Sequence, residues 1–155
     1  MRESNLQTAF GKWLKKEGAN YFIDTAVFEL KIEKTHRFAF SKVKEHQTIR
    51  LNQARIGLYY KISDSPIFIG QQTRFTAKKP FDAIFFKGCE AYIVIWFYKP
   101  RQPKIIYFVN ITDFENLVDT HDKKSITEPE LKEYIESFTV EGQIVDITKY
   151  FRSKI

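Results

Sequence analysis

The residue types best suited to chemistry in this chain are Glu29 and Lys31, which stand in the run AVFELKI. On a strand, side chains alternate between faces, so both point to one face, about 6–7 Å apart along the strand. The apolar Phe28, Leu30 and Ile32 point to the other face. Phosphodiester hydrolysis uses such a pair, because a carboxylate holds a divalent cation while an ammonium stabilises the developing negative charge. An ion pair on an exposed sheet face is the alternative, since E-x-K alone is common.

A metal site needs a second carboxylate, because one acid rarely holds Mg²⁺ or Mn²⁺. Asp82 is the first candidate, since it stands in KPFDAI at the entrance to an apolar strand. Asp24 competes for this role, but it precedes Glu29 by an odd number of residues and faces away on a regular strand. Glu3, before the first helix, is a candidate outer carboxylate. The alternatives are a turn aspartate at 82 and an acid that favours a helix N-terminus at 3.

A third candidate is Gln47, which shares one predicted helical face with the apolar Val43, Leu51 and Ala54. A buried amide needs hydrogen-bond partners. In a nuclease, Gln47 would hold the attacking water or orient the Glu29 or Lys31 side chain. The alternative is a structural glutamine that caps a loop carbonyl.

The charge of the chain suits a polyanion, with a formal net charge of +6 and a pI of about 9.3. One basic run lies directly before Asp82 and would bring phosphate-binding charge to the proposed metal. Solvated surface residues are the alternative for each single base. The predicted nucleic-acid-binding residues are Lys42, Lys44, His46, Arg74, Lys78 and Lys79.

The elements that must position these residues follow from periodicity and from turn and capping residues. Helices are predicted over 4–17, from an N-cap at Ser41 to Gly57, over 112–118 and, from a capping box at Thr127, over 128–137. Strands are predicted over 20–33, 37–40, 58–63, 81–86, 91–98, 104–111 and 139–147. This order predicts an α/β fold, in which a central mixed sheet is flanked by helices, in a single domain over 1–155.

Composition sets further limits. The lone Cys89 allows neither an intramolecular disulfide nor a cysteine-based zinc site, and the three histidines lack metal-ligand spacing. A reducing setting fits this composition. The sequence shows no signal peptide and no apolar run long enough to span a membrane, so we expect a cytoplasmic protein.

The runs AVFELK at 26–31, FAF at 38–40 and EHQ at 45–47, together with Leu51, resemble the PD-(D/E)xK nucleases. The similarity is closest to the RecU-type Holliday-junction resolvases and covers residues 26–62. It implies a restriction-endonuclease-like core and a homodimer that cuts branched or duplex DNA with Mg²⁺ or Mn²⁺. The site residues that it implies are metal-binding Glu29 and Asp82, catalytic Lys31, supporting Gln47 and a helix-borne Glu3.

The chain departs from that family in the order of its acids. The metal-binding aspartate of the family precedes the E-x-K strand, whereas here only Asp24 precedes it and Asp82 follows it. We interpret this as a permuted site, in which a neighbouring strand supplies the acid. The other hypotheses are a non-catalytic nucleic-acid-binding module, a repair or restriction-type nuclease, and a protein-interaction subunit.

Overall fold

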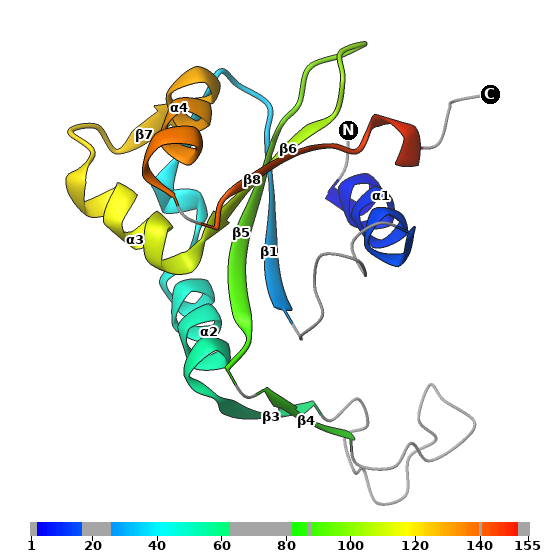
Figure 1. The fold of residues 1–155 in the computed structure, drawn as a ribbon, viewed down its shortest axis with the longest axis vertical. Helices are drawn as coiled ribbons and strands as arrows, with labels where there is room; N and C mark the ends of the chain where they lie inside the picture. Colours follow the sequence, from blue (N-terminus) through cyan, green and yellow to red (C-terminus); the bar gives the residue numbers. More distant parts are fainter. Residues whose placement is uncertain (1–2, 17–25, 63–81, 87, 140, 152–155) are drawn as a thin grey trace, which may run out of the picture.

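The computed structural model describes residues 3–16, 26–62, 82–86, 88–139 and 141–151 (Figure 1). A four-stranded sheet has the order β1-β5-β6-β8. Strand β1 (Ala26–Glu33) runs parallel to β5 (Glu90–Phe97), and β6 (Ile105–Asn110) and β8 (Gln143–Asp146) complete the sheet in antiparallel pairings. The sheet is therefore mixed, as predicted.

Strand β5 is central because its sequence, EAYIVIWF, is apolar on both faces. Every residue from Ala91 to Phe97 is buried. The register pairs Glu29 with Ile93 and Lys31 with Ile95. This pairing fixes the strand that carries the E-x-K residues against the most apolar strand of the molecule.

Two hydrophobic cores cover the two faces of the sheet. Helices α2 (Glu45–Ile56), α3 (Ile111–Thr120) and α4 (Glu128–Phe138) supply the first core, which also holds Ile93 and Ile95. Helix α1 (Glu3–Lys16) and the short helix η3 (Thr148–Tyr150) supply the second. The fold is thus α/β with helices on both faces (Figure 1), as the sequence predicts.

Helix α2 begins later than predicted, and Ser41 is not its N-cap. Residues Phe40–Lys42 form a separate turn of 3₁₀ helix, η2, and the chain is extended at Lys44 before α2 begins. The Oε1 atom of Gln47 accepts a hydrogen bond from the Lys44 backbone N–H at 2.9 Å, so Gln47 satisfies a donor that lies ahead of the first turn. The helix ends as predicted at Gly57, whose φ of 105° suits glycine.

Two small sheets lie outside the main one. Strand β2 (Arg37–Ala39) pairs with β7 (Ser125–Thr127), which is too short to have been recognised from its sequence. Strands β3 (Leu58–Ile62) and β4 (Asp82–Phe86) pair only with each other among the described strands. They lie beyond the C-terminal end of α2, away from the four-stranded sheet (Figure 1).

Candidate functional site

The side chains of Glu29, Lys31 and Gln47 form one hydrogen-bonded cluster. The Lys31 Nζ atom lies 2.8 Å from Glu29 Oε1 and donates to Gln47 Oε1 at 2.9 Å. The Gln47 Nε2 atom donates to the same Glu29 oxygen at 2.6 Å. Three residues separated by up to 18 positions in the chain thus meet at one point. We call this group the E-K-Q cluster.

Local sequence explains how the E-K-Q cluster is positioned. Phe28 and Leu30 pack into the core under α1, so the alternation of β1 directs Glu29 and Lys31 to the face that α2 covers. Gln47 occupies the third position of α2, in its first turn, beside this strand. Leu51 and Ala54, one and two turns further along α2, are buried and anchor the helix to the core.

The E-K-Q cluster is half-open to solvent. The Glu29 side chain is 27% exposed and the Lys31 side chain 16%. Gln47 is partly buried, and both its amide oxygen and its amide nitrogen are hydrogen-bonded. A reactant can therefore reach the carboxylate, while the glutamine fixes the orientation of the acid and the base.

A second acid–base pair on the same strand face was not predicted. Glu33 is fully buried, and its carboxylate is 2.6 Å from Lys42 Nζ. The backbone N–H and the hydroxyl of Thr35 each donate to it at 2.8 Å. Burial alone raises the pKa of Glu33, but the hydrogen bonds from Lys42 and Thr35 and the Lys42 charge outweigh it and lower that pKa below its ordinary value.

This second pair changes the interpretation of Lys42. We predicted that Lys42 binds nucleic acid, yet its ammonium is engaged by the buried Glu33 carboxylate. Its charge compensates a carboxylate that would otherwise be costly to bury. The sequence did carry the signal for Glu33, since it continues the alternation of Glu29 and Lys31 by one more step.

The acids predicted to join Glu29 do not lie on the strand beside it. The described neighbour of β1 is β5, whereas the strand that begins at Asp82 pairs with β3 in a separate sheet. Among the described strands, β5 and not β4 therefore lies next to β1 in the main sheet. The Asp82 side chain and the whole of Asp24 lie outside what the structure describes.

The third acid candidate, Glu3, opens helix α1, which packs on the face opposite to the E-K-Q cluster. Among the described residues, no group of three or more histidine, cysteine or acidic side chains could hold a metal ion. Glu29 is therefore the carboxylate that the described part of the site offers to a cation.

Apart from Lys42, the predicted nucleic-acid-binding residues divide into two groups. Lys44 and His46 are exposed where α2 begins, next to Gln47, and the Lys44 ammonium donates to the Ser41 carbonyl at 3.0 Å. Their position is compatible with a phosphate close to the E-K-Q cluster. The remaining three, Arg74, Lys78 and Lys79, lie outside the described residues.

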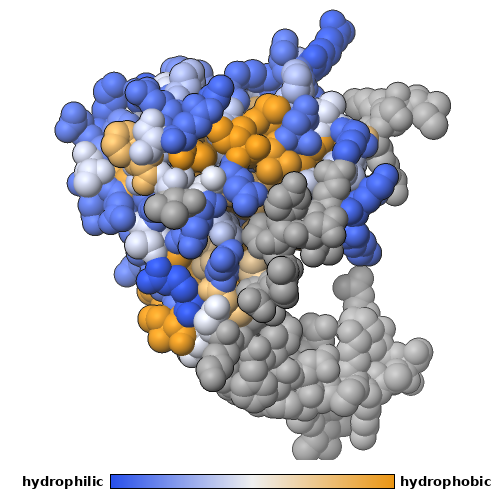
Figure 2. Space-filling view, in the orientation of Figure 1, coloured by the Kyte–Doolittle hydropathy of each residue, from blue (hydrophilic) through white to orange (hydrophobic). Residues whose placement is uncertain are grey.

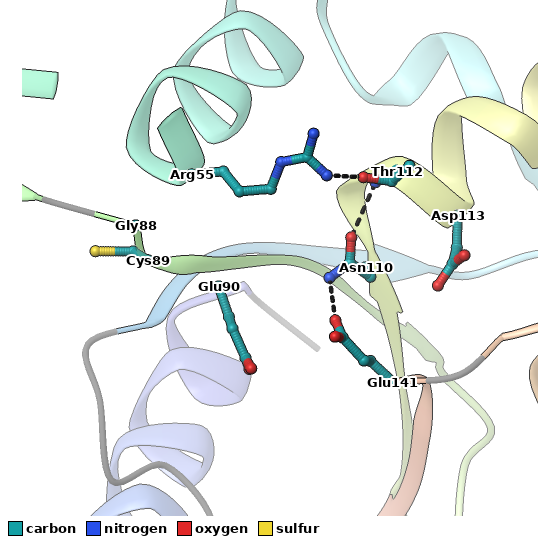
Figure 3. A pocket seen from close by; sticks show the side chains of 8 residues that line it. All are labelled: Arg55, Gly88, Cys89, Glu90, Asn110, Thr112, Asp113 and Glu141. Atoms are coloured by element: carbon teal, nitrogen blue, oxygen red, sulfur yellow. Dashed lines mark hydrogen bonds between the residues drawn. The ribbon is translucent and has the colours of Figure 1, made fainter. Parts of the chain in front are cut away.

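A separate polar cavity of about 360 Å³ lies where β5 begins and β6 ends (Figure 3). Three carboxylates line it, those of Glu90, Asp113 and Glu141, with Arg55 across the opening. Glu141 accepts a hydrogen bond from Asn110 at 2.7 Å, and burial raises the pKa of Asp113. Glu90 pairs with Ala26, so it stands on the opposite sheet face from Glu29 and does not complete the E-K-Q cluster.

Comparisons with protein-family models, with curated proteins and with solved structures found no match to this chain. The resemblance to the PD-(D/E)xK nucleases therefore stays a prediction from the sequence runs at 26–31, 38–40 and 45–47 together with Leu51. None of the helices in the described ranges is long and apolar enough to cross a membrane.

Proposed function

We propose that this protein is a metal-dependent endonuclease that hydrolyses phosphodiester bonds in DNA. The observation that carries the proposal is the E-K-Q cluster, in which one accessible carboxylate, one ammonium and one amide meet. Hydrolysis of a phosphodiester needs a ligand for a hard cation, a positive charge near the scissile phosphate and a group that orients them. The three side chains supply these in turn.

Each residue has a distinct part in the proposed reaction. Glu29 would hold Mg²⁺ or Mn²⁺, which when bound would polarise the phosphate and lower the pKa of a water molecule. Lys31 stabilises the negative charge that develops on the phosphate oxygens. Gln47 fixes the relative positions of the Glu29 carboxylate and the Lys31 ammonium, because its amide is hydrogen-bonded to both. A second acid for the cation would come from Asp82 or Asp24.

The residues around the cluster favour a polyanionic substrate. Lys44 and His46 are exposed at the N-terminal end of α2, where the helix dipole also favours phosphate. We extend the proposal to branched DNA and to a homodimer, as the RecU-type resolvases imply. A two-fold dimer would present two clusters to two strands.

The test is a nicking assay on a four-way DNA junction and on plain duplex, with Mg²⁺ or Mn²⁺ present or chelated. We expect metal-dependent cleavage that is lost in Glu29→Gln and in Lys31→Met. Cleavage that persists in both variants would show that the reaction occurs elsewhere. Preference for the junction over the duplex would support the resolvase form.

One observation favours a second function, that of a DNA-binding module without catalysis. No described acid joins Glu29, and the same Glu29 oxygen already accepts from Lys31 and Gln47. In that case the basic chain would bind DNA in a salt-sensitive way without cutting it. Filter binding across a salt series, with the nicking assay run in parallel, distinguishes the two functions.

A further inference from the structure

The charge of this chain is divided very unevenly along its sequence. Residues 111–138, which form α3, β7 and α4, contain eight acids and three lysines, a net charge of −5. Since the whole chain carries +6, the other residues together carry +11. Hydrophilic side chains cover much of this helical layer, and apolar side chains come to the surface among them (Figure 2). The negative charge of this layer disfavours a polyanion as its ligand.

A groove of about 580 Å³ lies between this acidic layer and helix α2. Val118, on α3, is 40% exposed, and Ile49, next to the groove residue Thr48, is 47% exposed. Asn52 on α2 donates to Glu115 on α3 at 2.6 Å and joins the two helices. The apolar residues that line the groove are Phe40, Val43, Phe114 and Val118.

The rim of the groove carries three carboxylates, those of Glu45, Glu115 and Asp119. None of the three forms an ion pair with another residue in the described ranges. Acids elsewhere in the same layer differ in this respect, since Glu130 lies within 4 Å of Arg37 and Lys123, and Glu136 pairs with Lys132. The groove therefore combines apolar surface with uncompensated negative charge.

We propose that this groove, lined by η2, α2 and α3, binds a segment of a partner protein that carries lysine or arginine beside large apolar side chains. The apolar side chains would cover Val118 and Val43, and the cations would meet the three rim carboxylates. The same carboxylates repel a nucleic acid, so the charge and the apolar lining of the groove favour a basic, partly apolar protein segment. This inference does not depend on the proposed nuclease activity.

The groove shares helix α2 with the E-K-Q cluster. Glu45 and Thr48 face the groove, whereas Gln47, between them in sequence, faces Glu29 and Lys31. A partner seated in the groove would thus contact the helix that positions the cluster without covering the cluster itself. Lys44 and His46, at the start of α2, are not among the residues that line the groove.

The experiment is an NMR titration of the isotope-labelled full chain with a helix-forming peptide that has leucine and lysine at helical spacing. Two sister peptides serve as probes of chemistry, one with glutamate for lysine and one with serine for leucine. We expect the leucine–lysine peptide to shift the methyl signals of Val43 and Val118, and the sister peptides to shift neither. Equal binding of the glutamate peptide, or shifts confined to other surfaces, would overturn the proposal.

Matched variants locate the interaction. Glu45→Gln, Glu115→Gln and Asp119→Asn combined should weaken peptide binding about tenfold. Asp122→Asn, Glu133→Gln and Glu136→Gln combined, which remove equal charge outside the groove, should leave it unchanged. Val118→Ser should weaken binding and Phe138→Ser should not, although Phe138 is 71% exposed. If the two combined charge variants weaken peptide binding equally, the assignment to the groove is overturned. It is also overturned if Mg²⁺ alone, or a higher protein concentration alone, shifts the methyl signals of Val43 and Val118.

Discussion

Two acid–lysine pairs lie on the same face of β1, and they are built in opposite ways. In the Glu29–Lys31 pair the acid is the more exposed partner, at 27% against 16%. In the Glu33–Lys42 pair the acid is fully buried and the lysine is 44% exposed. Accessible carboxylate oxygens can receive a cation, whereas a carboxylate enclosed by an ammonium, a hydroxyl and a backbone N–H has no room for one. Exposure thus separates a pair suited to chemistry from a pair suited to stability.

The largest expected effect is on cleavage, from Lys31→Met. We expect cleavage to fall by about 10³-fold, because one electrostatic stabiliser of the transition state is removed. The free energy of unfolding should fall by no more than about 1 kcal/mol, since the pair is partly solvated. Single-turnover cleavage and denaturant unfolding measure the two quantities. A stability loss that accounts for the whole activity loss would contradict a catalytic role.

The converse substitution, Lys42→Met, should act on stability. It leaves the Glu33 carboxylate buried without its cation, so unfolding should become easier by about 3 kcal/mol. Cleavage by the folded protein should stay within a few-fold of the wild type. Lys44→Met is the matched control, because Lys44 is exposed and should change stability by less than about 0.5 kcal/mol. Equal effects of the two substitutions would remove the distinction between the pairs.

Gln47→Ala should lie between these extremes. We expect cleavage to fall about 10–100-fold, because Gln47 contacts both Glu29 and Lys31. Loss of its bond to the Lys44 N–H should reduce stability by about 1 kcal/mol. Gln53→Ala on the same helix is the control for stability and activity. If both glutamine variants cleave equally, Gln47 has only a structural role.

The smallest effect, that of Glu33→Gln, should depend on pH. The pKa of Glu33 is lower in the folded protein than its ordinary value of 4.5, so the carboxylate adds stability above pH 4.5. That stability disappears as the pH falls through the folded-state pKa. We expect Glu33→Gln to lower the free energy of unfolding by about 1.5 kcal/mol at pH 7, which is the difference between a charged and a neutral hydrogen bond. Below the folded-state pKa of Glu33 the substitution should change that free energy very little. Urea unfolding at several pH values measures this, and a constant difference would contradict it.

Sequence reasoning predicted the sheet and the E-K-Q cluster because each follows from a local period. Alternation placed Glu29 and Lys31 on one face, and the helical stripe placed Gln47 on the inner side of α2. It missed the start of α2, because Ser41 is a favourable N-cap by type but lies in a separate 3₁₀ turn. It also placed the strand that begins at Asp82 next to β1, because no local pattern shows that β3 and β4 pair apart from the main sheet. Which strands become neighbours depends on long-range packing.

The parallel pairing of β1 with β5 has a consequence for the order of events during synthesis. Glu29 is matched with Ile93, a residue 64 positions later. The entropy lost in closing so long a loop must be offset before this pairing stabilises the chain, which makes it a late event in folding. Leu51 of α2 packs in the same core as Ile93 and Ile95. The position of α2, and with it that of Gln47, is therefore not fixed until β5 has joined the sheet. A nascent chain that ends before residue 97 would therefore carry the E-x-K residues without the support that orients them.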